Sequence, residues 1–429
     1  MKSISFFHVW KIVLLAASLL FAVLASFLPY SIELLLCLST VFLAGAVVLE
    51  TQSKKERRGW LPTIIWTAVG LSVLLTLIML LGHKLRLYVW IEALNLLNIA
   101  ALLAAELLKK KKKQAASQIL LVLCAAFTLF GAFSHIAYGR SVMSTIAEWI
   151  LASNKVHDEE VPAVFQTLTK AGEMHFKANP AAFDKLMKEA DFDGMPVLYV
   201  NDNEKTEHIV FYIHGGYYVY QMGSEQMSTM NRLANTTNST IVMPIYPLAP
   251  FHTTEENYET MVALYEKVSS ENAGKKIILM GDSAGGGYAL ALAEGLNVRG
   301  IEQPDELILL SPWVDVTMSN PDIRNFVDVE PMLTVTMGRT SGEAWAGSLP
   351  MDNWQVSPLY GDLSDLKNVT IFVGTRELFY PDDTLLAEKL SANPNATLVI
   401  GKGQNHVYPV YPTLEGRIAV EQIMEIVQR

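Results

Sequence analysis

The chain has 429 residues, of which 51% are hydrophobic and 18% charged, and its formal net charge is −10. The acidic balance argues against a nucleic-acid partner, because nucleic-acid-binding surfaces are basic. The chain has two cysteines, Cys37 and Cys124, so no disulfide framework holds it together. The high hydrophobic content is typical of a protein with membrane-embedded segments.

Five long apolar runs occupy the first part of the chain. They are Ile12–Leu28, Ile32–Val48, Trp60–Leu81, Tyr88–Leu108 and Gln118–Tyr138. Each is about 17–23 residues long, which is enough for a helix to cross a hydrocarbon core. Because short basic segments separate them, they predict an all-α transmembrane bundle of about five helices over residues 1–140. A cleaved signal peptide would explain the first run alone, and the four later runs argue against it.

Lysine and arginine are concentrated in alternate loops of this region. They cluster after the second run (Lys54, Lys55, Arg57 and Arg58) and after the fourth run (residues 109–113), whereas the loop after the first run has none. With five spans, the positive-inside rule places the N-terminus inside the plasma membrane and the chain after the fifth span outside it. Four spans instead of five would place it in the cytoplasm, and the sequence leaves this open. The lysines at 109–113 predict contact with anionic membrane lipids.

The composition changes near residue 140. Residues 1–140 hold 14 of the 33 Lys and Arg residues and 5 of the 43 Asp and Glu residues, so the remainder is strongly acidic. We therefore divide the chain into a membrane domain at 1–140, a linking region at 141–195 and a second domain at 196–429. Two amphipathic segments, Val142–Leu151 and Ala181–Ala190, predict helices in the linking region.

Short apolar runs alternate with helical patterns in the second domain. The predicted strands are Val197–Val200, Ile209–Ile213, Ile241–Ile245, Ile277–Met280, Leu307–Leu310, Val369–Val373 and Thr397–Ile400. The predicted helices are Glu225–Asn235, Glu255–Ser270, Ala284–Asn297 and Thr384–Ser391. Alternating strands and helices predict a doubly wound, mainly parallel sheet of the α/β class. Functional residues are expected at the carboxyl ends of its strands.

Two glycine-rich motifs follow two of these strands. Gly281-Asp282-Ser283-Ala284-Gly285 matches a nucleophile elbow, a sharp turn that exposes a serine hydroxyl between a strand and a helix. His214-Gly215-Gly216 matches a loop whose backbone N–H groups face an oxyanion. A glycine-rich packing turn is the alternative, but the strand, the helix and the upstream loop together favour acyl transfer.

Chain order identifies the partners of the serine. In this architecture the acid and then the histidine follow the nucleophile, and His406 is the one histidine beyond Ser283. His406 is therefore the predicted base. The acid is expected after the preceding strand, where Glu377 is the first candidate and Asp382 and Asp383 compete with it. A carboxylate there would orient the imidazole and stabilise the imidazolium.

These motifs carry a family resemblance. From about Pro196 onwards the chain resembles the hormone-sensitive-lipase-like esterases and lipases of the α/β-hydrolase fold. The matching pieces are HGGYY (214–218), YPLAP (246–250), GDSAGG (281–286), SPW (311–313), GTRE (374–377) and the loop that carries His406. The resemblance implies Ser283 as nucleophile, Glu377 as acid and His406 as base, with an oxyanion hole formed by Gly215, Gly216 and Ala284. It also implies a helical cap from residues 141–195, assisted by an insertion at 321–353.

The chain departs from the family pattern at two positions. The third glycine of the usual HGGG loop is Tyr217, which would bring a bulky ring into the wall of the site, and we assign substrate contacts to Tyr217 and Tyr218. The acid is a glutamate where aspartate is more usual, an accepted variant of the triad. Met332, Met337, Trp345 and Met351 in the insertion are candidates for the pocket lining or for ordinary core.

The sequence thus predicts a membrane-anchored serine hydrolase of carboxylic esters, acting on a small-molecule or lipid ester through an acyl-enzyme. The motifs of zinc, P-loop and dinucleotide sites do not occur, so we expect no metal and no cofactor. An acyltransferase with the same triad remains an alternative, as does a catalytically silent binding protein on a hydrolase scaffold. Substrate identity cannot be read from the sequence.

Overall fold

The computed structural model describes residues 114–429, apart from residues 174, 175 and 178. The chain divides into two compact units, Met1–Thr145 and Ile146–Arg429. Four of the five apolar runs precede residue 114 and lie outside the described residues. The loops with the lysine and arginine clusters, on which the predicted membrane orientation rests, lie outside the described residues as well.

Helix α5, Gln114–Tyr138, contains the fifth apolar run. In the part of the chain that the structure describes, no helix combines the length and the apolar character needed to cross a membrane. The run Gln118–Tyr138 is helical as expected, but its prediction as a span finds no support. Its last turns bring polar side chains, those of Ser134 and His135, into the helix, and both are buried.

The second unit is built around one sheet of eight strands in the order β1-β2-β4-β3-β5-β6-β7-β8. The strands are β1 (Met187–Phe192), β2 (Met195–Val200), β3 (His208–Ile213), β4 (Thr240–Pro244), β5 (Lys276–Asp282), β6 (Glu306–Leu310), β7 (Val369–Gly374) and β8 (Ala396–Gly401). The strands β4, β3, β5, β6, β7 and β8 are parallel, and β1 and β2 are antiparallel to their neighbours. The predicted, mainly parallel sheet is confirmed, with all seven predicted strands in it.

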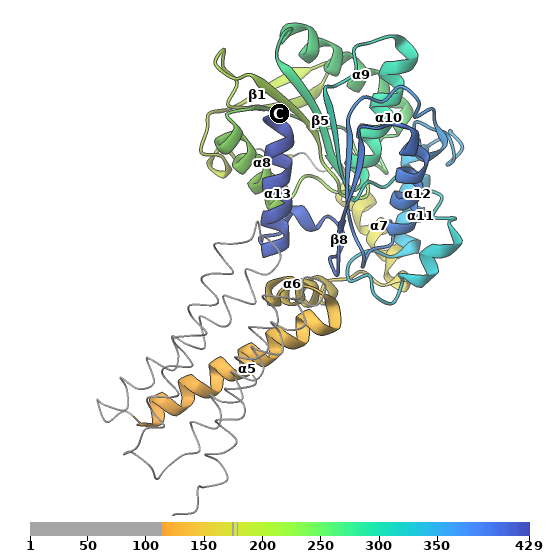
Figure 1. The fold of residues 1–429 in the computed structure, drawn as a ribbon. Helices are drawn as coiled ribbons and strands as arrows, with labels where there is room; N and C mark the ends of the chain where they lie inside the picture. The colour runs from red at the N-terminus through yellow and green to blue at the C-terminus, as the bar shows by residue number, and fades with distance from the viewer. Residues whose placement is uncertain (1–113, 174–175, 178) are drawn as a thin grey trace, which may run out of the picture. The chain divides into compact units, whose positions relative to one another are not determined.

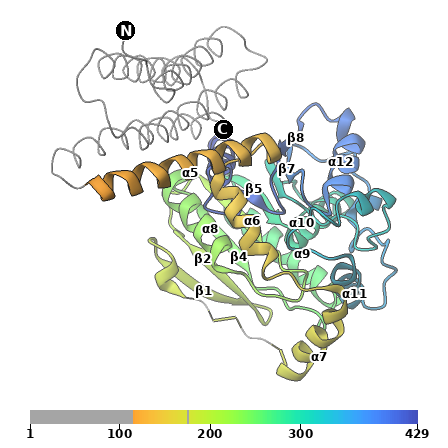
Figure 2. The ribbon, with the colours of Figure 1, turned by 90° about the horizontal axis from the view of Figure 1, so that it is seen from below.

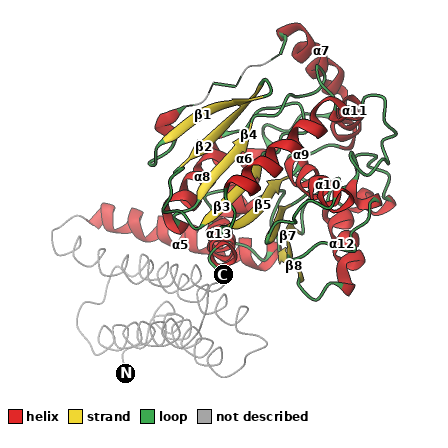
Figure 3. Cartoon of the chain, turned by 90° about the horizontal axis from the view of Figure 1, so that it is seen from above, coloured by secondary structure: helices red, strands yellow, loops and turns green. Residues whose placement is uncertain are grey.

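Helices cover both faces of the sheet (Figure 1). The helices that cover the sheet include α8 (Ser224–Thr237), α9 (Thr254–Glu271), α10 (Ala284–Arg299), α12 (Tyr380–Lys389) and α13 (Leu414–Val427). Helices α9 and α10 pack on one face, where Figure 3 shows them in red beside the yellow strands, and α8 and α13 pack on the other. The four predicted helices correspond to α8, α9, α10 and α12.

The strand side chains divide between two hydrophobic cores, one on each face. In β5, Ile277 and Leu279 belong to the core beneath α9 and α10, whereas Ile278 and Met280 belong to the core beneath α8 and α13. Successive side chains of a strand point to opposite faces, so a strand covered on both faces must be apolar throughout. This explains why the central strands are continuous apolar runs. It also fixes their register, because a slip by one residue would exchange the two faces.

Strand β1 corrects the prediction of a helix at Ala181–Ala190. Met187–Phe192 pairs antiparallel with β2 at the edge of the sheet, where β1, β2 and β4 follow one another in Figure 2. The connection is the two-residue turn Asp193-Gly194, with φ of 51° and 82°. Two successive positive φ values match the right-handed twist of a hairpin, which makes Asp-Gly a strong hairpin signal. That signal outweighs the helical spacing of the preceding residues.

The linking region and the insertion both contain helices. Helix α6 (Val142–Ala152) matches the predicted helix there. It is followed by α7 (Val161–Ala171), a helix that was not predicted. The insertion at 321–353 contains a short 3₁₀ turn, η3 (Pro321–Asn325), and helix α11 (Val335–Ala346).

Candidate active site

Ser283 stands on a sharp turn between β5 and α10. Its backbone adopts φ 53° and ψ −124°, which is unfavourable for a residue with a side chain and is expected at a nucleophile elbow. The flanking glycines make the turn possible. A Cβ at Gly281 would lie 2.2 Å from the carbonyl oxygen of Gly285, and one at Gly285 would lie 2.1 Å from that of Ile213. The motif therefore needs both glycines for close backbone packing.

Three side chains from distant parts of the chain form one line of hydrogen bonds. The Nε2 atom of His406 lies 2.8 Å from Oγ of Ser283, and its Nδ1 atom lies 2.6 Å from Oε2 of Glu377. All three residues are buried, and Ser283 is the most exposed of them at 9%. This is the geometry of a nucleophile, a base and an orienting acid. The structure thus brings together the three residues that the sequence predicted for these roles.

The glutamate is itself held in place. Its other oxygen, Oε1, accepts hydrogen bonds from the hydroxyl of Ser311 at 2.8 Å and from the N–H of Gly374 at 2.5 Å. The hydroxyl of Ser311 also accepts a bond from the N–H of Val407, next to the histidine. Ser311, the serine of the SPW motif, thus connects the loop of the acid with the loop of the base. The ring of Phe379 packs edge-on against the His406 imidazole.

The competing carboxylates lie elsewhere. Oδ1 of Asp382 accepts a hydrogen bond from the side chain of Asn320, and burial raises the pKa of Asp382 to about 7. Burial also raises the pKa of Asp383 well above its usual value, with the charge of Glu377 as the next cause. Neither contacts the imidazole, whereas Glu377 does. The structure therefore favours Glu377 as the acid.

The HGG loop corrects one predicted oxyanion donor. The N–H of Gly215 donates to Oδ1 of Asp282 at 2.9 Å, so this donor points at a buried carboxylate and away from the position of an oxyanion. In the part of the chain that the structure describes, the N–H groups of Gly216, Tyr217 and Ala284 donate to no protein acceptor. Gly216 and Ala284 remain candidate donors, and Tyr217 replaces Gly215 as the third candidate.

Asp282 holds this loop against the elbow. Besides the N–H of Gly215, its Oδ1 accepts from the hydroxyl of Tyr212 at 2.5 Å and from Nε2 of Gln226 at 3.1 Å, and its Oδ2 accepts from the same amide at 2.9 Å. Burial, followed by the charge of Asp282, raises the pKa of Tyr212 well above its usual value, so the phenol stays a donor. The carboxylate beside Ser283 therefore positions the HGG loop.

His214 contacts the HGG loop and does not contact Ser283. Its ring nitrogen Nδ1 lies 2.8 Å from the carbonyl oxygen of Gly215, and the ring stacks on Tyr246, whose hydroxyl donates to the carbonyl oxygen of His214. Burial lowers the pKa of His214, which favours the neutral ring. His252 lies between the carboxylates of Glu173 and Glu256.

The serine opens into a cavity of about 370 Å³. Its wall includes Ser283 and His406 together with apolar and aromatic side chains, among them Val156, Tyr217, Tyr220, Met332, Leu333, Met337, Val407, Val410 and Tyr411. A volume of this size with an apolar lining and a few polar groups is typical of a small-molecule site. Met332 and Met337, predicted as possible lining residues, lie in this wall, and Trp345 and Met351 pack in the core instead.

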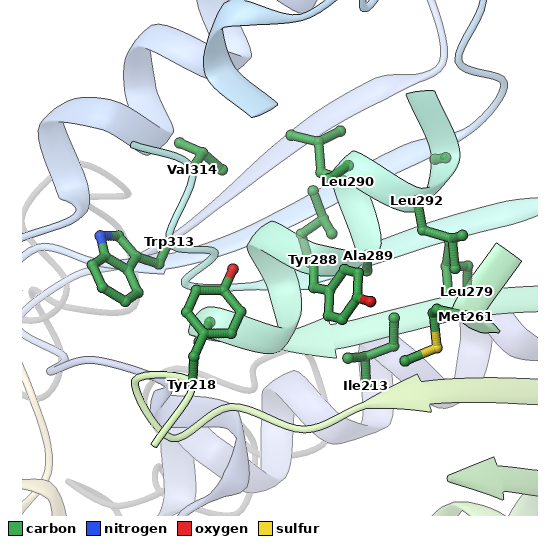
Figure 4. Close-up of a cluster of buried hydrophobic side chains, with 14 of the residues drawn as sticks. Ile213, Tyr218, Met261, Leu279, Tyr288, Ala289, Leu290, Leu292, Trp313 and Val314 are labelled. Carbon is green, nitrogen blue, oxygen red and sulfur yellow. The ribbon is translucent and has the colours of Figure 1, made fainter. Parts of the chain in front are cut away.

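The two tyrosines of the HGGYY motif differ in position. Tyr217 lines the cavity, and its hydroxyl accepts a hydrogen bond from the N–H of Thr334 at 3.3 Å. Tyr218 is 1% exposed, and its ring stacks on Trp345 and on Trp313; Figure 4 shows it beside Trp313. The structure therefore supports a substrate contact for Tyr217 and not for Tyr218, which belongs to the aromatic core beneath the loop.

Comparison with known proteins agrees with the fold. Residues 210–410 match the family model described as "alpha/beta hydrolase fold". The chain is 29% identical to a triacylglycerol lipase of Mycobacterium tuberculosis over 43% of its own length and 38% of that lipase, and 28% identical to an esterase of Acinetobacter venetianus over 42% of its own length and 60% of that esterase. The chain therefore spans less than two thirds of the length of each of these relatives.

A solved structure gives the same result in three dimensions. A hormone-sensitive lipase from a metagenome library superposes with a TM-score of 0.54 at 27% identity, covering 66% of this chain and 95% of that one. The second unit therefore has the α/β-hydrolase fold, and it is similar to hormone-sensitive-lipase-like esterases.

Proposed function

We propose that the protein is a serine hydrolase of carboxylic esters. The observation that carries the proposal is the continuous contact from Ser283 through His406 to Glu377 at the wall of a 370 Å³ cavity. The names of the relatives, esterase and lipase, agree with this reaction. The intact set of three side chains speaks against a silent binding protein.

The geometry accounts for each chemical step. Nε2 of His406 takes the proton of the Ser283 hydroxyl while the oxygen attacks the ester carbonyl. The proton then passes to the leaving alcohol, and a water activated by the same nitrogen releases the acid. Glu377 accepts from Nδ1 of the ring, so it fixes the tautomer in which Nε2 is the free base and stabilises the imidazolium.

The oxyanion of the tetrahedral intermediate would bind the N–H groups of Gly216, Tyr217 and Ala284. The last of these opens helix α10, so the positive end of the helix dipole adds to the field at the oxyanion. Each such donor is worth about 3–4 kcal/mol of transition-state stabilisation. The backbone supplies all three donors, which is why a tyrosine can stand at position 217 without removing one.

The cavity indicates the class of acyl group. Much of its wall is formed by methionine, leucine, valine and tyrosine side chains, Tyr217 among them, which suit an uncharged acyl chain. We infer an ester with a small or medium apolar acyl group. Water is the proposed acceptor, and an acyltransferase would use an alcohol at the same step.

Steady-state hydrolysis of p-nitrophenyl acetate and butyrate by the full chain tests the reaction. The wild type should release p-nitrophenol, and Ser283→Ala should reduce the rate by about 10³-fold or more. Product analysis with an added alcohol measures transfer against hydrolysis. A wild type that is folded and inactive toward all esters tried would contradict the proposal.

We further propose that residues 1–113 attach the enzyme to the plasma membrane. The proposal rests on the four apolar runs before residue 114 and on the basic residues between them. Cell fractionation with alkaline carbonate washing tests attachment, and a reporter fused after Arg429 tests the side. Release by carbonate would contradict attachment. A reporter active only in the cytoplasm would agree with four spans, and a reporter active outside would require a fifth span.

A further inference from the structure

The buried carboxylate of Glu330 binds the backbone of two residues that line the catalytic cavity. Glu330 stands between η3 and α11 in the insertion and is 3% exposed. Its Oε1 accepts hydrogen bonds from the N–H of Met332 at 2.6 Å and from the N–H of Leu333 at 3.0 Å. Pro331 has no N–H to donate, and the two residues after it are the donors. Both of these residues line the cavity.

The other oxygen of Glu330 reaches the loop of the triad. Oε2 accepts from the N–H of Leu378 at 3.1 Å, and Leu378 directly follows the acid Glu377. The carbonyl oxygen of Glu330 also accepts from Nζ of Lys155, in the segment after α6. One residue thus connects the linking region, the cavity wall and the acid loop. A carboxylate buried with three backbone donors is expensive to remove, because each donor would then be left unpaired.

From this geometry we propose that Glu330 is a positioning residue of the esterase reaction. It fixes the position of the cavity wall at Met332 and Leu333 relative to the loop that carries the acid Glu377. The proposal rests on the proposed hydrolase function and adds to it a residue outside the triad. Sequence patterns do not identify this residue, because its partners on the two sides are backbone groups.

The charge of Glu330 also acts on the triad. The positive charge of His406 lowers the pKa of the Glu330 carboxyl, and the negative charge of Glu377 raises it. Because this interaction is mutual, the negative charge of Glu330 stabilises the imidazolium form of His406. Burial raises the pKa of Glu330 to about 6, which leaves it ionised at neutral pH. The other titratable groups around it are Lys155, Tyr217 and Tyr411.

The first test compares Glu330→Gln with wild type and with Glu343→Gln, an exposed glutamate of the same insertion. A glutamine amide in place of the Glu330 carboxylate can accept on one side only, so kcat/KM should fall about 10- to 100-fold. KM should rise more for butyrate and hexanoate esters than for acetate. The acid limb of the pH profile of kcat/KM should move to lower pH, because the His406 imidazolium loses a neighbouring anion. Glu343→Gln should behave as wild type.

A second variant separates the effect of the charge at position 330 from the effect of the side-chain length. Glu330→Asp keeps the charge but is one methylene shorter, so it should leave the acid limb close to wild type and still alter the chain-length dependence of KM. If Glu330→Gln fails to fold, this variant carries the test. Wild-type kinetics for every ester and every pH in a folded Glu330→Asp or Glu330→Gln protein would overturn the proposal.

Hydrogen exchange tests the coupling without any activity. In Glu330→Gln, the amides of residues 332–338 and those of residues 377–380 should both exchange faster than in Glu343→Gln. Faster exchange in only one of the two segments would overturn the coupling, whatever the enzyme's rate. An inactive wild type with both segments loosened in the variant would count against the proposed reaction and in favour of the positioning role.

Discussion

Replacing Asp282 by asparagine tests whether this carboxylate positions the HGG loop. The carboxylate accepts from the hydroxyl of Tyr212, the N–H of Gly215 and the amide of Gln226. Asparagine keeps one acceptor oxygen but turns an NH₂ group toward the Gln226 amide. A hydrogen bond to a charged group contributes about 1.5–3 kcal/mol and a neutral one about 1 kcal/mol. The three bonds together should lose about 2–4 kcal/mol.

Two measurements follow from this magnitude. The melting temperature of Asp282→Asn should fall by roughly 5–10 °C. The value of kcat should fall by about 10²-fold as the N–H groups of Gly216 and Tyr217 move from the oxyanion, with a small change in KM. Asp322→Asn, at an exposed aspartate, is the matched control. If Asp282→Asn melts and turns over like this control, Asp282 does not hold the loop.

Three further predictions concern single side chains. Glu377→Gln should keep the fold and lower kcat by about 10²–10⁴-fold, since the amide cannot stabilise the imidazolium of His406, and stopped-flow hydrolysis measures this. Tyr217→Gly should enlarge the cavity and shift the preference from acetate toward longer acyl esters; an unchanged chain-length profile would show that the ring does not limit the cavity. Burial raises the pKa of Glu294 from its ordinary value of about 4.5 to about 9. Between these two pH values the carboxyl is protonated in the folded state and ionised in the unfolded state. The free energy of unfolding should therefore fall as the pH rises from about 5 to 9. Glu294→Gln should therefore gain melting temperature over wild type across this range, increasingly toward pH 9, whereas Glu302→Gln at an exposed site should not.

Much of the fold could be predicted from the sequence because its signals are local. The central strands are covered on both faces, so they are continuous apolar runs that stand out along the chain. The edge strand β1 could not be recognised in this way. Its side chains are mostly exposed, its spacing is helical, and the hairpin signal at Asp193-Gly194 lies beyond its end.

The site divides in the same way. Ser283, His406 and Glu377 follow strands in a fixed chain order, so strand prediction and order suffice to find them. The use of the Gly215 N–H could not be foreseen, because it depends on how closely the loop approaches Asp282. The different positions of Tyr217 and Tyr218 depend on side-chain packing against Trp313 and the insertion. Adjacent residues of identical type carry no signal for such a difference.

The most direct test of the account is the intact mass of the protein after reaction with a fluorophosphonate, followed by peptide mapping. The account predicts one adduct, carried by Ser283, and no adduct on the Ser283→Ala protein. Labelling at another residue, or no labelling of a folded wild type, would contradict it.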